Sequence, residues 1–182
     1  SDNPISTNKK LIARTIAGRD VLNVRRQTFF VNFGGWDHHD GVLENQGAML
    51  SVVSKALGEF RTALEELGLA KNVTTFTISD FGRTLTSNGN GSDHAWGGNV
   101  MVMGDSVKGG KVYGTYPSLA LGGVDDIGGA IMLPSLSTDE YFAELCRWFG
   151  VESGDLRYVL PNITHFYDPT SYEAPIGFMD VG

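Results

Sequence analysis

Apolar residues recur at steps of three and four along two stretches of the chain, and this spacing predicts two helices. The clearer stretch is residues 43–67, where Gly68 provides a natural stop. Residues 5–22 show the same period. A third helix is predicted to begin at Ser137, because Glu140 follows three residues later in a capping-box pattern.

Short runs of β-branched and aromatic residues predict strands between these helices. The predicted strands are residues 26–33, 72–80, 99–104 and 110–114. The polar, glycine-rich stretch 81–98 and the stretch 115–136 are predicted to be loops, and the tail 160–182 to lie along the surface. The alternation of helices and strands favours an α/β fold, a layered sandwich with a mostly parallel central sheet.

Titratable side chains follow the first predicted strand directly: Asp37, His38 and His39 come after two glycines. In an extended segment residues i and i+2 point the same way, so Asp37 and His39 could reach one ion, and His38 would point elsewhere. Carboxylate oxygen and imidazole nitrogen together suit zinc, manganese or iron. The alternative is a polar loop in which one histidine caps a backbone group.

A second group of polar residues follows the strand predicted at 72–80. Asp80 ends that strand, where it could bind a metal or cap a turn. Arg83 could hold a phosphate or sulfate oxygen, or form a salt bridge with Asp80. The turn-forming residues 88–91 would fold the backbone back and bring Asp93 and His94 toward the same site.

Asp37, His39, Asp80 and His94 therefore form a candidate set of oxygen and nitrogen ligands. Neither a nucleophile-elbow serine nor a Walker-type phosphate loop is present, so metal-assisted hydrolysis is the natural class if the chain is an enzyme. Calcium binding by the glycine-rich loops is an alternative, although their spacing does not match the helix–loop–helix calcium pattern. His165 is predicted to be a packed or surface histidine, and Cys146 a small core residue.

Composition narrows the class of partner. With 182 residues, 41% hydrophobic and 19% charged, the chain can form a single domain, residues 1–182, with its own core. The net charge of −7 and the absence of a cluster of Lys and Arg argue against nucleic-acid binding. No apolar run approaches the roughly 18 residues that a membrane span requires. The oligomeric state does not follow from the sequence.

Two long segments resemble a known family. "FFVNFGGWDHHDGVLENQ" and "VTTFTISDFGRTLTSNGNGSDHAWGGNVMVMGDSVKGGKVYGTYP" are similar to the C-terminal half of the bacterial family catalogued as domain of unknown function 1501. That family looks like a branch of the alkaline phosphatase and sulfatase superfamily, whose members are α/β sandwiches that hydrolyse phosphate or sulfate esters with bound metals. The resemblance implies an alkaline phosphatase-like but incomplete domain, a C-terminal fragment of a longer protein.

The resemblance also implies roles for individual residues. The metal ligands would be Asp37, His39, Asp80 and His94, binding a divalent ion, zinc or manganese, with calcium as an alternative. Two positions depart from the usual pattern: His38 replaces a threonine, and Phe81 stands where the superfamily often has a histidine ligand, so that one metal site would be incomplete. The nucleophile would lie in an absent N-terminal segment.

Two functions follow as expectations. The first is a metal-dependent hydrolase of sulfate or phosphate esters, acting on a small anionic ester or a sulfated or phosphorylated polymer. In it, Arg83 steadies the anionic group and His38 donates a proton to the leaving group. The second is a non-catalytic structural or binding module that keeps the fold and one metal site. For both, the resemblance implies a periplasmic or extracellular location.

Overall fold

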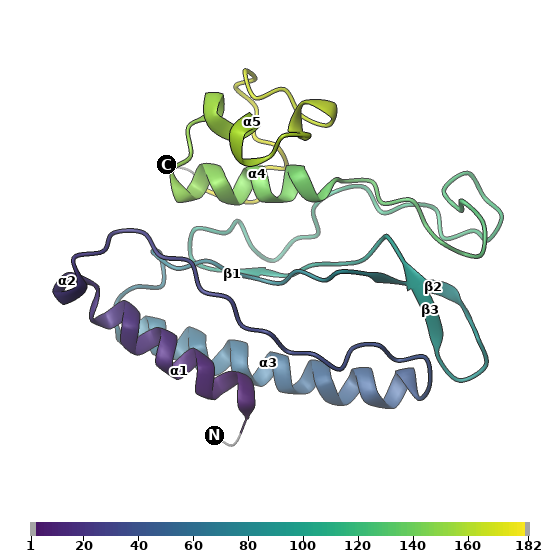
Figure 1. Ribbon diagram of the computed structural model, residues 1–182, viewed down its shortest axis with the longest axis horizontal. Coiled ribbons are helices and arrows are strands. Elements are labelled where there is room, and N and C mark those ends of the chain that lie inside the picture. Colours follow the sequence, from purple (N-terminus) through teal and green to yellow (C-terminus); the bar gives the residue numbers. More distant parts are fainter. Residues whose placement is uncertain (1–2, 181–182) are drawn as a thin grey trace. The chain divides into compact units, whose positions relative to one another are not determined.

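A computed structural model describes residues 3–180 (Figure 1). The chain divides into two compact units. Unit 1 comprises the chain up to Val73 together with Thr86–Asp93, and unit 2 comprises Thr74–Leu85 together with the chain from His94 onward. Whether the two units make one domain, as the composition predicts, stays a prediction.

Unit 1 is built on two long helices, α1 (Pro4–Ala17) and α3 (Val42–Glu66), which Figure 1 shows running alongside each other. The first helix is capped by Asn3, whose side-chain oxygen accepts from the backbone N–H groups of Ile5 and Ser6. The same side chain donates to the backbone oxygen of Val52 in α3 at 2.8 Å. Their shared core consists of Ala13, Ile16, Phe60, Leu64 and Leu69.

The predicted helices of unit 1 are confirmed, with one break. Residues 5–22 form α1 and a short helix α2 (Arg19–Leu22), separated at Gly18. The predicted helix 43–67 is α3. One face of this helix is buried through Ala56, Phe60 and Leu64, which follow one another at steps of four. Gly68 follows the helix with φ of +67°, a conformation that glycine adopts without strain.

The predicted α/β sandwich is wrong. The described residues contain only two small sheets, each of two strands, and no large parallel central sheet. One sheet pairs β1 (Thr75–Phe76) with β4 (Val102–Met103) in antiparallel register, with Thr75 opposite Met103. The other pairs β2 (Gly82–Ser87) with β3 (Ser92–Ala95), and its tip belongs to unit 1.

The predicted strands 72–80 and 99–104 contain β1 and β4, which are shorter than predicted. The other two strand predictions failed, because a strand needs a partner for its backbone hydrogen bonds, and composition does not supply one. Residues 26–33 are extended but belong to no sheet, and Phe30 in their midst is 78% exposed. Residues 110–114 form no strand either. Conversely, the predicted loop 81–98 contains β2 and β3, because the turn between Ser87 and Ser92 lets its two arms pair.

Unit 2 is built around helix α4 (Thr138–Phe149). The predicted capping box is confirmed: Ser137 Oγ accepts from the Glu140 N–H at 3.0 Å, and the Glu140 carboxylate accepts from the Ser137 N–H at 2.8 Å. Three short helices follow, which Figure 1 shows gathered beside α4: η1 (Ser153–Asp155), α5 (Leu156–Val159) and η2 (Ile163–His165). The predicted core position of Cys146 fits its packing on Ala143, Leu156 and Ile163, and burial raises the pKa of its thiol.

The end of unit 2 is held by a buried carboxylate. Glu144 of α4 is 1% exposed and accepts from the N–H groups of Ile176, Gly177 and Met179 at 2.9–3.2 Å. Phe178 and Met179 are 4% and 1% exposed and pack on Tyr141 and Leu145. The prediction that the tail lies along the surface is therefore wrong for this last described segment.

In residues 3–180, no helix is both long enough and apolar enough to cross a membrane, which agrees with the expectation from the sequence.

Candidate metal site

The loop between residues 33 and 41 carries the first candidate ligands, and its backbone is fixed from both ends. Gly35 has φ of +95°, and a Cβ added there would lie 3.5 Å from Cε of Met49 in α3. Trp36 donates its indole N–H to the Phe33 carbonyl at 2.7 Å. Gly41, with φ of +57°, is the N-cap of α3. The start of α3 therefore anchors the loop.

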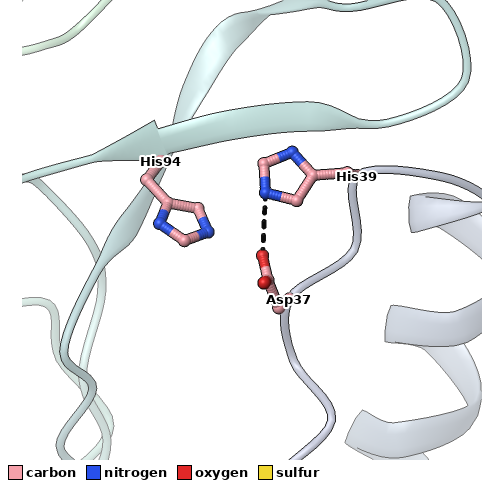
Figure 2. Close-up of side chains that lie close together, drawn as sticks. All are labelled: Asp37, His39 and His94. Atoms are coloured by element: carbon pink, nitrogen blue, oxygen red, sulfur yellow. Dashed lines mark ion pairs between the residues drawn. The ribbon is translucent and has the colours of Figure 1, made fainter.

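Asp37 and His39 contact each other, although the segment between them is turned and not extended as the sequence predicts. His39 Nε2 lies 2.9 Å from Asp37 Oδ1, the contact that Figure 2 draws as a dashed line. The backbone is tightly turned here, with the His39 N–H donating to the Asp37 carbonyl at 3.2 Å. The two side chains are 49% and 60% exposed, so the pair is reachable from solvent.

A second carboxylate contacts the other ring nitrogen of His39. Asp93, in β3, places Oδ1 3.3 Å from His39 Nδ1, although the two residues are 54 positions apart in the chain. Asn88, in the turn before β3, donates to the same Asp93 oxygen at 3.1 Å and to the His39 carbonyl at 3.3 Å. The turn of the hairpin therefore supplies one carboxylate and the amide that holds it.

Two further features bring the hairpin turn against the loop. A Cβ added at Gly91 would clash with the backbone of His38 and His39, so only glycine allows this approach. Asn90 donates through its side chain to the Asp40 carboxylate, and its carbonyl accepts from the Val42 N–H at 3.3 Å. The glycine and asparagine turn predicted to bring Asp93 toward a site does so within unit 1.

The side chain of His38 is buried, whereas those of its neighbours Asp37 and His39 are exposed. Its side chain is 7% exposed and lies edge-on to Trp36, with ring centroids 6.3 Å apart. Its Nε2 atom is buried without a hydrogen-bond partner among the described residues. A buried polar atom of this kind is one that a water molecule, an ion or a ligand would satisfy. The predicted role of His38 as a proton donor stays a prediction.

The remaining candidates belong to unit 2. His94 is exposed and stacks on Phe81, with ring centroids 3.9 Å apart and planes 8° from parallel. The guanidinium carbon of Arg83 lies 5.2 Å from the centroid of the same Phe81 ring. Asp80 is exposed in the connection between β1 and β2. Phe81 therefore contacts both the candidate ligand His94 and the candidate anion-binding residue Arg83.

His165 lies far along the chain from these residues, in η2, and is exposed, which agrees with the prediction of a surface histidine. Its ring contacts that of Phe166 edge-on, with centroids 6.3 Å apart. It is therefore a suitable control for experiments on the other histidines.

The donor atoms around His39 suit a divalent transition metal. Two ligand atoms bound to one tetrahedral ion at about 2.0–2.2 Å lie roughly 3.3–3.6 Å apart. The Asp37–His39 contact of 2.9 Å is shorter than this separation. A rotation of the exposed Asp37 side chain that moves its Oδ1 atom by about half an ångström would open the required space. The pair therefore fits an ion without movement of the backbone.

Together, the fold and these contacts define a small α-helical and β-hairpin protein with an exposed cluster of carboxylate and imidazole groups. The sequence profile of a family described as proteins of unknown function, DUF1501, matches residues 2–155. The chain therefore belongs to that family, as the resemblance of its motifs indicated. No curated protein and no solved structure matches the chain.

Proposed function

We propose that this chain binds a divalent transition-metal ion, zinc or manganese, through Asp37 and His39 of unit 1 (Figure 2), with His94 as the further ligand that the sequence predicts. The observation that carries the proposal is the contact of Asp37 with His39 Nε2 in an exposed, backbone-anchored loop. Oxygen and nitrogen donors in one set are typical of zinc, manganese and iron sites, whereas calcium takes oxygen ligands only.

His94 enters the proposal through its place in the chain and its ring geometry. It directly follows Asp93, whose carboxylate contacts His39. The stack on Phe81 engages a face of the imidazole, whereas the lone pair that binds a metal lies in the ring plane. Phe81 therefore restricts the rotation of His94 and leaves the edge of the ring suited to a ligand role. Asp80 stays a proposed fourth ligand.

The function proposed for this site is hydrolysis of a sulfate or phosphate ester. A bound ion would polarise the ester and neutralise developing negative charge. Arg83 would bind the anionic group through its planar guanidinium, which matches two oxygens at once. The net charge of −7 disfavours the approach of a highly anionic substrate, so a small ester fits better than a polyanion. The alkaline phosphatase and sulfatase relationship and a periplasmic or extracellular location belong to this proposal.

The second candidate is a non-catalytic module that uses the metal to join its loop to its hairpin. The supporting observation is Phe81, which stands where the superfamily often has another ligand. Metal binding is common to both candidates, so it is tested first.

The test is elemental analysis of the purified chain after dialysis against zinc or manganese. We expect about one equivalent of metal in the unmodified protein, and a loss in each of Asp37→Ala, His39→Ala, Asp80→Ala and His94→Ala. His165→Ala should retain the full equivalent. Equal metal content in all of these proteins would reject the site, and retention in Asp80→Ala alone would remove only that residue from it.

Turnover separates the two candidates. The metal-loaded protein is assayed with aryl sulfates and aryl phosphates, with Arg83→Lys as a variant that keeps the charge but loses the paired N–H donors. Hydrolysis that requires metal and falls in Arg83→Lys supports the hydrolase. Binding of one equivalent of metal without turnover in the intact protein supports the module.

A further inference from the structure

We infer that Asp93 is a positioning residue, which holds the His39 ring so that Nε2 rather than Nδ1 faces the metal. This inference rests on the proposed metal site, and it assigns a role to a carboxylate outside the ligand set. Each ring nitrogen of His39 contacts a different carboxylate: Nε2 lies 2.9 Å from Asp37 and Nδ1 lies 3.3 Å from Asp93. Only one of these two nitrogens can offer a lone pair while the other carries a proton.

The Asn88 amide fixes the Asp93 carboxylate beside the His39 ring. The Asp93 oxygen that contacts His39 also accepts from the Asn88 side-chain amide at 3.1 Å. This bond holds the Asp93 oxygen beside His39 Nδ1, where it can accept from that nitrogen when Nδ1 carries the proton. Asp37 is in the same loop as His39 and can rotate with it. Asp37 therefore suits the role of ligand, and Asp93 that of hydrogen-bond acceptor.

Asn88 makes this arrangement rigid. Its amide donates to the Asp93 carboxylate and to the His39 carbonyl, and its side-chain oxygen accepts from the Gly91 N–H at 3.0 Å. The backbone that carries His39 and the carboxylate that faces its ring are thus tied to a single side chain. Because Gly91 lacks a Cβ, the turn can come close enough for both bonds.

The chemical consequence concerns the tautomer of His39. A histidine that binds a metal through one nitrogen commonly donates its other N–H to a carboxylate or carbonyl, which fixes the ring and increases its basicity. With the proton on Nδ1 and directed at Asp93, the lone pair of Nε2 is directed toward Asp37. Loss of an acceptor in such a position typically weakens metal affinity about 10- to 100-fold.

The test compares Asp93→Ala and Asp93→Asn in the full chain. Asp40→Ala is the matched control. The Asp40 carboxylate also joins the loop to the hairpin turn, through Asn90, and carries the same charge as Asp93, but its hydrogen bond is to Asn90 and not to the His39 ring. Zinc affinity is measured by competition with a chromogenic chelator. The protonation of the His39 nitrogens is read from long-range proton–nitrogen NMR spectra of the zinc-loaded proteins.

We expect Asp93→Ala to bind one equivalent of zinc about 10- to 100-fold more weakly and to lose the protected Nδ1 proton signal of His39. Asp93→Asn, whose amide oxygen still accepts a hydrogen bond, should retain that signal and lie between the two affinities. Asp40→Ala should match the unmodified protein in both measurements.

Three outcomes would overturn the inference. Unchanged affinity and an unchanged Nδ1 signal in Asp93→Ala would leave Asp93 without a positioning role. Complete loss of zinc in both Asp93 variants would make Asp93 a ligand. Zinc bound to Nδ1 in the unmodified protein would reverse the roles of Asp37 and Asp93. In each of these cases the unmodified protein still binds zinc, so the proposed function survives. Absence of zinc binding in the unmodified protein would reject both.

Discussion

Units 1 and 2 differ in the charged groups that they bury and in those that they leave exposed. In unit 2, the Glu144 carboxylate is buried and accepts from three backbone N–H groups. In unit 1, the carboxylates of Asp37 and Asp93 are 60% and 62% exposed and meet at a histidine. The buried charge of unit 1 is instead an amine, Lys9, which is 8% exposed and lies over the Phe60 ring, 5.1 Å from its centroid.

The difference separates a charge that holds the fold together from charges that solvent and ions can reach. A buried carboxylate is stable only when its oxygens are hydrogen-bonded, and the bonds of Glu144 hold the end of the chain against α4. An exposed carboxylate contributes little to stability through one ion pair, and its remaining lone pairs can bind an ion. Removal of a charge should therefore destabilise unit 2 at Glu144, stabilise unit 1 at Lys9, and leave stability nearly unchanged at Asp37.

The largest expected effect is that of Glu144→Ala. The substitution leaves three N–H groups near the chain end without their acceptor, and each unsatisfied buried group costs roughly 1–3 kcal/mol. We expect the free energy of unfolding of unit 2 to fall by about 3–5 kcal/mol, measured by urea denaturation. Glu152→Ala, which removes an exposed carboxylate from the same unit, should change it by less than about 0.5 kcal/mol. Similar values for the two variants would contradict the structural role of Glu144.

The next effect in size is that of Gly91→Ala. The new methyl group would overlap the His38 and His39 backbone, so the hairpin turn must move away from the loop. Overpacking of this kind costs about 1–3 kcal/mol, and it should also weaken zinc binding because the Asp93–His39 contact is lost. Gly58→Ala in α3, where an added methyl group has no atom within 4 Å, should instead stabilise the chain by about 0.5–1 kcal/mol. Equal effects of the two substitutions, by urea denaturation, would argue against the close approach at Gly91.

These two glycines also show where prediction from the sequence succeeds and where it fails. The helices α3 and α4 were predictable because their signals are local: apolar residues at steps of four in one, and Ser137 with Glu140 in the other. The strands β1 and β4 fall within the predicted strands 72–80 and 99–104, but their pairing was not predictable, and residues 26–33 have the composition of a strand without a partner. The sequence marks Gly91 as a turn residue and Gly58 as a helix residue, but nothing local shows that Gly91 lies against the backbone of His38 and His39.

The same reasoning applies to the candidate site. That Asp37 and His39 lie close together was predictable from their closeness in the sequence, but the tight turn that brings their side chains into contact was not. The Asp93–His39 contact joins residues 54 positions apart and depends on the hairpin, whose strands the sequence predicts to be a loop. The role of Asn88 was missed for the same reason, although the Asn-Gly pair at residues 88–89 did signal the turn that positions it.

A smaller effect of opposite sign is expected for Lys9→Met. Burial lowers the pKa of the Lys9 amine to about 8 from 10.5, so folding disfavours its charged form at neutral pH. Methionine keeps the apolar stem of the side chain without the charge. We expect the free energy of unfolding at pH 7 to rise by about 1–2 kcal/mol, once the lost contact with the Phe60 ring is subtracted. A loss of stability at pH 7 would show that the contact with Phe60 outweighs the burial of the charge.

The pH dependence gives an independent check on Lys9. Between pH 8 and pH 10.5 the unfolded chain binds more protons at this amine than the folded chain does, so the stability of unit 1 should rise with pH across this window. Below pH 8 both states are protonated and above 10.5 neither is, so the contribution is flat outside it. The rise should be absent in Lys9→Met, as measured by urea denaturation at a series of pH values.

The smallest effect on stability is expected for Asp37→Ala in the metal-free protein. Because the side chain is 60% exposed and its ion pair is screened by solvent, the free energy of unfolding should change by less than about 0.5 kcal/mol. Added zinc should then separate the two proteins: an ion that binds only the folded chain raises stability by about 2.7 kcal/mol at 100 times its dissociation constant. The unmodified protein should show this increase, and Asp37→Ala little of it. An equal increase in the free energy of unfolding of both proteins would place the bound zinc elsewhere. A large loss of stability in metal-free Asp37→Ala would instead show that this exposed carboxylate of unit 1 has a structural role, as Glu144 does in unit 2.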